Sequence, residues 1–288
     1  MHMIVLSNTT GNERADAVLR GIVGIYESAF PGRVRGYYLE GSYADGIGIA
    51  TSDIDLEIVF KDGLQDDERG KAQQIAESCA LLSAVELDCS LTDEKGLANG
   101  IVPIFKESLP VYGEDVRDKF PLIALDKWTR DRMHAAYWLT INIYDRPESV
   151  IYPLTYPDPA GEFYGYDNRK LRLPDGNEVN CTRNLVRTTG WIASALLAYK
   201  AGKMLATKRE CFQAYHECLQ PEDAQLLHDI YEQCRQQWNY LIPEDAADRM
   251  VLRNVCARTL AFENRFLEVY KRFLLSDTKC GGTGLAIR

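Results

Sequence analysis

The sequence predicts an α+β fold in which a domain containing a β-sheet precedes a domain built of helices. Runs of β-branched and aromatic residues, or of alternating apolar and polar residues, indicate strands at 34–39, 56–60 and 85–91. From about residue 124 onward, apolar residues instead recur at helical spacing. We place the boundary between the two domains near Pro121.

The first domain alternates predicted helices and strands. A helix over 13–30 precedes the first strand, because its apolar residues recur every three or four positions. A short helix and a glycine-rich loop follow Ser42 and lead to the second strand. A further helix is expected over about 66–83, before the third strand. Together these elements predict a sheet covered by helices.

The second domain is predicted to be a bundle of helices. They are expected near 124–144, 186–201, 208–219, 221–241 and 244–275. Pro221 and Pro243 are each followed by two acidic residues, which is typical of the first turn of a helix. The end of the chain, from Thr278 to Arg288, contains three glycines and is expected to form a loose tail.

An irregular insertion, residues 145–182, separates the first two helices of this domain. Tyrosines alternate there with prolines and acidic residues, among them Tyr152, Tyr156, Tyr164, Tyr166, Pro153, Pro157, Pro159, Pro174, Asp158, Glu162 and Asp167. Aromatic faces and carboxylates together suit a hydroxylated, positively charged ring compound. The segment is therefore one candidate for lining a substrate-binding site. The alternative is a structural insertion that covers helix ends, with a β-hairpin over 170–179.

Composition is that of a globular protein with an acidic surface. The chain has 288 residues, and 33 Lys plus Arg against 42 Asp plus Glu give a net charge of −9. Such a surface disfavours nucleic acid and favours cationic partners, although solubility alone also explains it. The eight cysteines show no Cys-x-x-Cys spacing, and no apolar run has the length of a membrane span. We therefore expect reduced thiols, no membrane association and a cytoplasmic location.

The most informative segment is 41–55, where a Gly-Ser pair is followed by two aspartates one residue apart. Gly41 permits close approach of the backbone to a ligand, and Ser42 adds a hydroxyl at a strand-to-helix corner suited to phosphate. Side chains alternate along a strand, so Asp53 and Asp55 should emerge on one face. Two adjacent carboxylates favour a divalent cation, and Mg²⁺ is the expected ion beside a nucleoside triphosphate.

These residues resemble the motif of the nucleotidyltransferases related to DNA polymerase β. The match comprises Gly41, Ser42, Asp53 and Asp55, and the residues around them are similar to the corresponding segment in the aminoglycoside adenylyltransferase branch. The resemblance implies an α/β catalytic domain with a mixed sheet over 1–121, closed by a segment at 109–117. An all-α helical bundle over 122–276, which carries the insertion, and a tail over 277–288 would follow.

The resemblance also implies a third carboxylate on a later strand. Glu86, Asp88 and Ser90 share one face of the predicted strand 85–91. Asp88 is our first choice and Glu86 the substitute, because a shift of two residues preserves the face and changes the residue. The implied catalytic residues are thus Asp53, Asp55 and Asp88 or Glu86, and the implied metal ligands are Asp53, Asp55 and Asp88.

Two further candidates lie in the second domain. The segment 202–210 is similar to one that opens a helix in the adenylyltransferase branch and brings a lysine to the triphosphate, and Lys208 is the matching position. Tyr231 is a candidate for stacking on adenine. The alternatives are a solvated lysine and a core tyrosine.

The resemblance implies transfer of a nucleoside monophosphate, with ATP as donor and Mg²⁺ as cofactor, to a hydroxyl of a small molecule. A cationic antibiotic of aminoglycoside type, as in antibiotic resistance, agrees with the acidic charge. Two other classes stay open. One is a nucleotidyltransferase acting on a protein or an RNA, including antitoxin relatives, and the other is a relative that binds nucleotide without chemistry.

Overall fold

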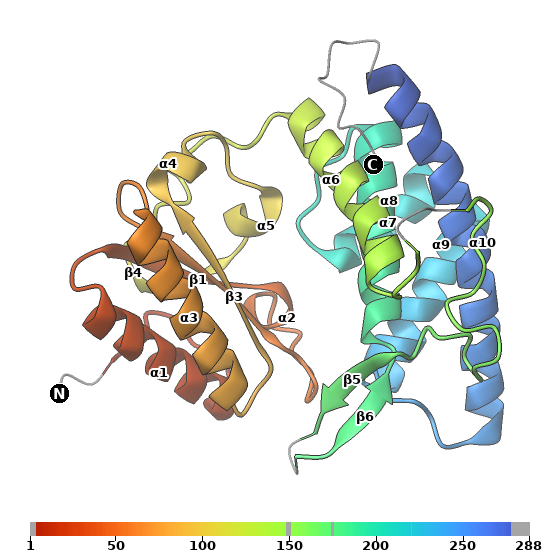
Figure 1. Cartoon of the computed structure of the whole chain (residues 1–288), viewed down its shortest axis with the longest axis horizontal. Helices are drawn as coiled ribbons and strands as arrows, with labels where there is room; N and C mark the ends of the chain where they lie inside the picture. The colour runs from red at the N-terminus through yellow and green to blue at the C-terminus, as the bar shows by residue number, and fades with distance from the viewer. Residues whose placement is uncertain (1–3, 148–150, 174–175, 220, 278–288) are drawn as a thin grey trace. The chain divides into compact units, whose positions relative to one another are not determined.

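The computed structural model describes residues 4–147, 151–173, 176–219 and 221–277. The chain divides into two compact units, and the helices and strands of both are shown in Figure 1. The first unit comprises Met1–Ala124 with two short later segments, Arg172–Asn177 and Leu205–Thr207. The second unit comprises the rest of the chain, and each unit is described by itself.

A four-stranded mixed sheet forms the centre of the first unit, in the order β3-β2-β1-β4. Strand β1 runs antiparallel to both β2 and β4, whereas β3 runs parallel to β2. The bounds are β1 Val34–Glu40, β2 Ile54–Phe60, β3 Leu87–Asp93 and β4 Leu109–Gly113. This sheet, followed by a helical region, confirms the predicted α+β class.

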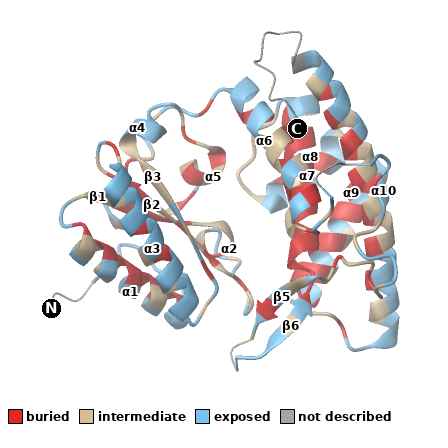
Figure 2. Cartoon of the chain, in the orientation of Figure 1, coloured by how far each residue is buried: buried red, intermediate tan, exposed pale blue. Residues whose placement is uncertain are grey.

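One face of the sheet carries the main core of this unit. Helices α1 (Glu13–Ala29) and α3 (Asp66–Leu82) pack on it, and their outer sides are exposed (Figure 2). The Asn12 side chain caps α1 by accepting hydrogen bonds from the backbone of the first turn. Alternate strand residues enter this core, among them Leu39, Ile54, Leu56, Ile58 and Leu87. Their intervening neighbours consequently point to the opposite face.

The opposite face has a smaller core that covers one end of it. Tyr38 and Val59 pack there with residues of the short helices α4 (Glu94–Leu97) and α5 (Pro103–Lys106). Toward the other end, the same face carries only polar and acidic strand residues: Glu40, Asp55, Glu57, Asp88 and Ser90. The fold therefore gathers carboxylates at one end of one sheet face.

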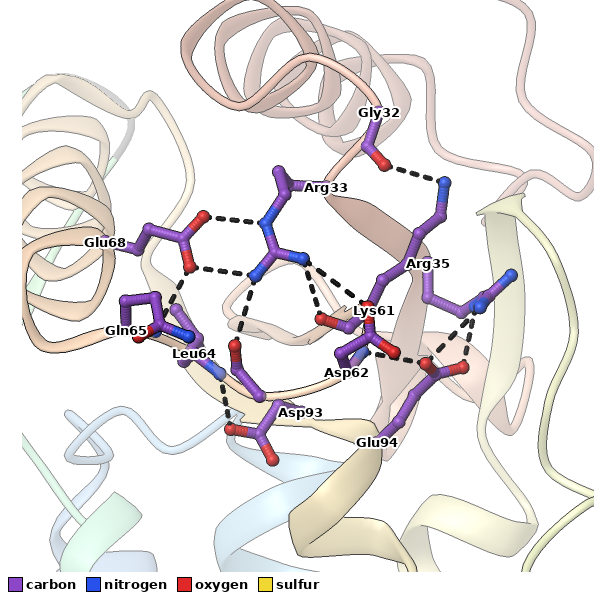
Figure 3. Close-up of polar contacts among 11 residues, drawn as sticks. Gly32, Arg33, Arg35, Lys61, Asp62, Leu64, Gln65, Glu68, Asp93 and Glu94 are labelled. Carbon is purple, nitrogen blue, oxygen red and sulfur yellow. Dashed lines mark hydrogen bonds and ion pairs between the residues drawn. The ribbon is translucent and has the colours of Figure 1, made fainter.

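An arginine-centred network binds the connection between β2 and α3 (Figure 3). The Arg33 guanidinium donates two hydrogen bonds to Glu68, from Nε at 2.7 Å and from Nη2 at 2.9 Å. It also donates to the carbonyl oxygens of Lys61 and Gly63, each at 3.1 Å. Arg33 thereby ties the start of β1 to the turn after β2 and to the first turn of α3.

A second ion pair continues this network toward β3. Arg35 Nε donates to Glu94 at 2.7 Å, and the same carboxylate accepts the Asp62 backbone N–H at 2.8 Å. Asp93 accepts the backbone N–H of Leu64 at 2.9 Å (Figure 3). The ends of β2 and β3 remote from the acidic residues are thus held by charged side chains.

The second unit consists mainly of helices. They are α6 Leu125–Asn142, α7 Arg183–Ala201, α8 Lys208–Cys218, α9 Pro221–Asp229, the π-helix η1 Ile230–Gln237 and α10 Ala246–Asp277. The helix predicted over 221–241 is therefore wrong as one element, because the chain widens from α-helix to π-helix at Ile230. The predicted tail from Thr278 lies outside the described residues. None of the described helices combines the length and apolar character needed to cross a membrane.

The insertion between α6 and α7 contains a two-stranded hairpin. Its strands are β5 Arg169–Arg172 and β6 Glu178–Cys181. Before the hairpin, the chain follows α10 and is fixed to it by a buried ion pair. Arg146 Nη2 lies 2.7 Å from Glu263, and the Tyr166 hydroxyl donates to the same carboxylate at 2.7 Å. Glu263 is 0% exposed, so this pair belongs to the core of the second unit.

Candidate functional site

The Gly-Ser pair forms a tight corner at the end of β1, where the four-residue helix α2 (Gly41–Ala44) begins. Gly41 has a φ of +67°, a conformation that side-chain-bearing residues rarely adopt. A Cβ added at Gly41 would lie 2.7 Å from Asp55 Oδ2. The corner therefore places the Gly41 backbone directly against the Asp55 carboxylate, and only glycine leaves room for both.

Ser42 is held by a second serine that the sequence analysis did not single out. The Ser42 hydroxyl donates to the Ser52 Oγ at 2.9 Å, and the Ile49 backbone N–H donates to the same atom at 2.9 Å. Ser52 is only 5% exposed. Its place immediately before Asp53 was the one available signal in the sequence. Ser52 thus links the Gly-Ser corner to the start of the aspartate strand.

The two motif aspartates lie at the start of β2. Asp53 directly precedes the strand, Asp55 is its second residue, and both are half-buried. Ile54 between them is fully buried in the main core, as the predicted alternation requires. Burial raises the pKa of Tyr43 in helix α2, and the charge of Asp53 raises it further. The structure thus brings Asp53 and Asp55 to the Gly41 corner.

The candidates for the third carboxylate lie on the neighbouring strand. Asp88 is the register partner of Asp55 in the parallel pair of β2 and β3. Glu86 directly precedes β3, and its carbonyl oxygen accepts the Ile54 backbone N–H at 2.8 Å. Asp88 is therefore paired directly with Asp55 across the two strands. Glu86 and Asp53 each lie one residue before the start of their strand. Both candidates reach the same edge, and the choice between them stays a prediction.

Glu57 is a further carboxylate on this face, and the sequence analysis did not assign it. It lies two residues after Asp55 on β2, opposite Tyr38 of β1 and Ser90 of β3. Burial raises the pKa of Glu57 to about 8, and the negative charges of Glu40 and Asp88 contribute to the rise. The alternation of Asp53, Asp55 and Glu57 could have indicated the shared face.

The chemistry of this donor set fits a divalent cation. Carboxylate oxygens are the ligands that Mg²⁺ prefers, and here they come from adjacent strands. Burial raises the pKa of Glu57, and the nearby charges of Glu40 and Asp88 add to the rise; a bound cation would oppose that charge contribution. Within the described residues, no three His, Cys, Asp or Glu side chains are already arranged to hold a metal ion. The predicted ligand set of Asp53, Asp55 and Asp88 stays a prediction.

The two remaining predicted ligand-binding residues belong to the second unit. Lys208 is the first residue of α8 and is exposed. Its Cγ would lie 3.1 Å from a Cβ added at Gly190 of α7, so the lysine stem runs over that glycine. Tyr231 is only 7% exposed, and its ring packs edge-on against Phe212 at 5.4 Å between centroids. Burial of this kind is typical of a packing role, and adenine stacking by Tyr231 stays a prediction.

The tyrosines of the insertion contact α10. The Tyr152 hydroxyl donates to Glu268 at 2.5 Å, and the Tyr166 hydroxyl donates to Glu263. Tyr156 and Tyr164 stack on each other with ring centroids 4.2 Å apart.

Three acidic residues of the insertion, Asp158, Glu162 and Asp167, have partners within the second unit. Glu162 forms an ion pair with Arg249 of α10, and Asp158 Oδ1 accepts the Ala160 backbone N–H at 3.1 Å. Asp167 accepts a hydrogen bond from Asn180 at 3.4 Å. These contacts favour the structural alternative for the insertion, although several of them lie along α10 and not at helix ends, as that alternative expected.

The chain was compared with protein-family models, curated proteins and solved structures. No family model matches the chain, and no curated protein matches it. Among solved structures, the chain is similar to spectinomycin adenyltransferase AAD(9) from Enterococcus faecialis, crystallised with ATP and spectinomycin. The two are 12% identical over 84% of this chain and 98% of that chain, with a TM-score of 0.48.

Proposed function

We propose that this chain is a nucleotidyltransferase that moves AMP from ATP to a hydroxyl of a small, cationic molecule of aminoglycoside type. The observation that carries this proposal is the convergence at one sheet edge. Gly41 presents its backbone to the Asp55 carboxylate, and Asp88 is the register partner of Asp55. A phosphate-binding corner beside paired carboxylates is suited to a triphosphate and its metal ion.

Within this proposal, residues 1–121 form the catalytic domain. Residues 122–276 form a helical domain that contributes to substrate and nucleotide binding, with Lys208 at the start of α8 as its contact to phosphate. A lysine at this position would supply a mobile positive charge to a phosphate oxygen. The proposed division follows the end of the sheet-bearing region and the start of α6 at Leu125.

The first-unit residues would bind and orient the triphosphate. The Gly41 backbone and the Ser42 hydroxyl would contact phosphate oxygens, and Ser52 would hold the Ser42 side chain in place. Asp53, Asp55 and Asp88 are the residues that would hold Mg²⁺. When bound, Mg²⁺ would neutralise charge on the phosphates and so make pyrophosphate a better leaving group.

Transfer needs an acceptor for one proton. The oxygen of the acceptor hydroxyl would form a new bond to the α-phosphorus as the bond to the bridging oxygen of pyrophosphate breaks. Asp88, or Glu86, would accept the hydroxyl proton, since each lies at the same edge as Asp55. The products are a nucleotidylated acceptor and pyrophosphate. Acidic residues around this edge and a net charge of −9 favour an acceptor that bears amines.

The test is transfer by the full chain. Purified protein would be incubated with ATP, Mg²⁺ and a panel of aminoglycosides including spectinomycin, and pyrophosphate release would be measured. Asp55→Asn should reduce release by about 100-fold or more, because the lost charge is needed once metal and triphosphate bind. Asp67→Asn makes the same chemical change at an exposed position of α3 and should behave as wild type. Equal rates for Asp55→Asn and Asp67→Asn would contradict the proposal.

A further inference from the structure

The Glu57 carboxyl group occupies a place on the acidic face that the proposed chemistry leaves unused. It is the next residue after Asp55 on β2 whose side chain points to the same face, two residues further along the strand, or about 7 Å. The phosphate-binding corner lies at the other side of Asp55, where Gly41 contacts it. Glu57 is therefore displaced from the triphosphate end of the site in the direction away from Gly41.

The surroundings of Glu57 are negative and give it no counter-charge. Glu40 on β1 and Asp88 on β3 are both aligned with Asp55, two residues from Glu57 on the same face, and both carry the same sign as Glu57. Across the part of the chain that the structure describes, no hydrogen bond or ion pair reaches the Glu57 carboxyl group. Of the two residues paired with Glu57 across the sheet, Tyr38 and Ser90, Tyr38 has its hydroxyl occupied by the Glu114 carbonyl oxygen at 2.7 Å and the Val116 N–H at 2.9 Å.

A half-buried carboxyl group without a partner is costly to keep, and a cationic ligand would remove that cost. Along the strand direction, the three carboxylates assigned to the metal lie nearer than Glu57 to the end of the sheet at which Gly41 follows β1. The remaining reactant is the acceptor, whose hydroxyl must approach the row of Asp55 and Asp88. An ammonium group on that acceptor would be within reach of the Glu57 carboxyl group, which lies two residues further along β2 on the same face.

We propose that Glu57 binds an ammonium group of the acceptor and thereby selects acceptors that bear amines. This inference rests on the proposed nucleotidyltransferase function and adds a specificity-determining residue to it. An ammonium ion donates up to three hydrogen bonds, so it can satisfy Glu57 and at the same time contact a neighbouring oxygen such as the Ser90 hydroxyl. Neutral acceptors would leave the Glu57 carboxyl group unsatisfied and would bind more weakly.

Binding and turnover would be measured separately on wild type and on Glu57→Gln. Thermal shift with Mg²⁺ and a non-hydrolysable ATP analogue reports on the nucleotide side, and further stabilisation by an aminoglycoside reports on the acceptor side. We expect Glu57→Gln to keep the nucleotide-dependent shift and to raise the apparent Kd and KM for the aminoglycoside about tenfold or more. The matched control is Glu77→Gln, which removes the same charge from an exposed position on α3.

A chemical change on the ligand completes the test. The aminoglycoside that stabilises wild type most would be compared with its fully N-acetylated form, which keeps the ring hydroxyls and loses the positive charges. Acetylation should weaken binding to wild type and have little further effect on Glu57→Gln, as expected for two groups that interact directly.

Three outcomes would overturn the inference. One is equal aminoglycoside affinity in wild type and Glu57→Gln, and another is loss of the nucleotide-dependent shift in Glu57→Gln, which would move Glu57 to the metal side. The third is an absence of aminoglycoside stabilisation in wild type. The proposed function is judged independently of these results, since it fails only if Asp55→Asn behaves as Asp67→Asn.

Discussion

Asp55 and Asp88 are register partners on the parallel strands β2 and β3, one from each strand at the same level of the sheet. Parallel strands begin at the same edge, so residues near their starts converge there. Gly41 closes this edge from the side of β1, with a backbone that leaves no room for a Cβ beside the Asp55 carboxylate. The arrangement brings together residues that are distant in the sequence, since Gly41 and Asp88 are 47 positions apart.

The first prediction concerns the identity of the third carboxylate. Because Asp88 is in the row of Asp55, Asp88→Asn should lower kcat by about 100-fold or more, the range expected for loss of a proton acceptor. Glu86→Gln should have a much smaller effect. Pyrophosphate release at saturating ATP and acceptor measures both variants, with thermal unfolding as a check on folding. The reverse order of effects would assign the role to Glu86.

The second prediction concerns the corner glycine. Gly41→Ala should destabilise the protein by about 1–2 kcal/mol, because alanine is strained at positive φ. The new Cβ should also displace the Asp55 carboxylate and weaken Mg²⁺-dependent ATP binding. Gly21→Ala is the matched control, since its Cβ would meet no atom within 4 Å and α1 favours alanine. Urea unfolding and nucleotide titration would be run on both, and unchanged ATP affinity in Gly41→Ala would contradict this account.

The third prediction concerns the serine pair. Ser52→Ala removes the partner of the Ser42 hydroxyl and of the Ile49 N–H, leaving a backbone donor without its acceptor. We expect a loss of about 1–2 kcal/mol in stability and a higher KM for ATP. Ser78→Ala, at an exposed position on α3, should change neither quantity. If KM for ATP stays constant while stability falls, Ser52 supports the loop alone and does not position Ser42.

The fourth prediction is a pH dependence of stability from the Arg33–Glu68 pair. Hydrogen bonds from the Arg33 side chain, together with one from the Gln65 backbone N–H, lower the pKa of Glu68 from its ordinary value of 4.5 to about 2. A carboxyl whose pKa is lower in the folded state stabilises the protein above the unfolded pKa, and this contribution is lost as pH falls through the folded value. Glu68→Gln should therefore cost about 1–2 kcal/mol near neutral pH, and the difference from wild type should shrink between about pH 4.5 and pH 2. Urea unfolding across this range measures the difference, and a pH-independent difference would show that the ion pair is not its source.

The fifth prediction concerns the buried ion pair of the second unit. Glu263→Ala should cost about 3–5 kcal/mol, because it leaves the Arg146 guanidinium buried without its counter-charge. Replacing both residues by apolar ones, as in Arg146→Met with Glu263→Leu, should cost less than Glu263→Ala alone. Tyr166→Phe removes one hydrogen bond and should cost about 1 kcal/mol. A double variant less stable than Glu263→Ala would indicate that packing, and not charge, dominates at this site.

Local sequence signals were sufficient for most elements of the fold. The strands around Tyr37 and Ile58, and the helices α1 and α3, follow from periodicity and end signals that act within a few residues. The mixed sheet was expected only through the resemblance of segment 41–55, because strand order depends on pairing between distant segments. The π-helix η1 has no comparable local signal, so the predicted single helix over 221–241 was wrong from Ile230 onward.

The sequence by itself determined which chemical groups are present and in what order: a Gly-Ser corner, the paired aspartates and a later acidic strand. Only the tertiary structure decided that Asp88 lies in the row of Asp55, that Ser52 holds Ser42, and that Glu57 shares the acidic face. The physical reason is that strand alternation is local, whereas register depends on hydrogen bonds between strands. A shift of two residues preserves the alternation and exchanges Asp88 for Glu86, so pairing in three dimensions is what places a particular carboxylate in the site.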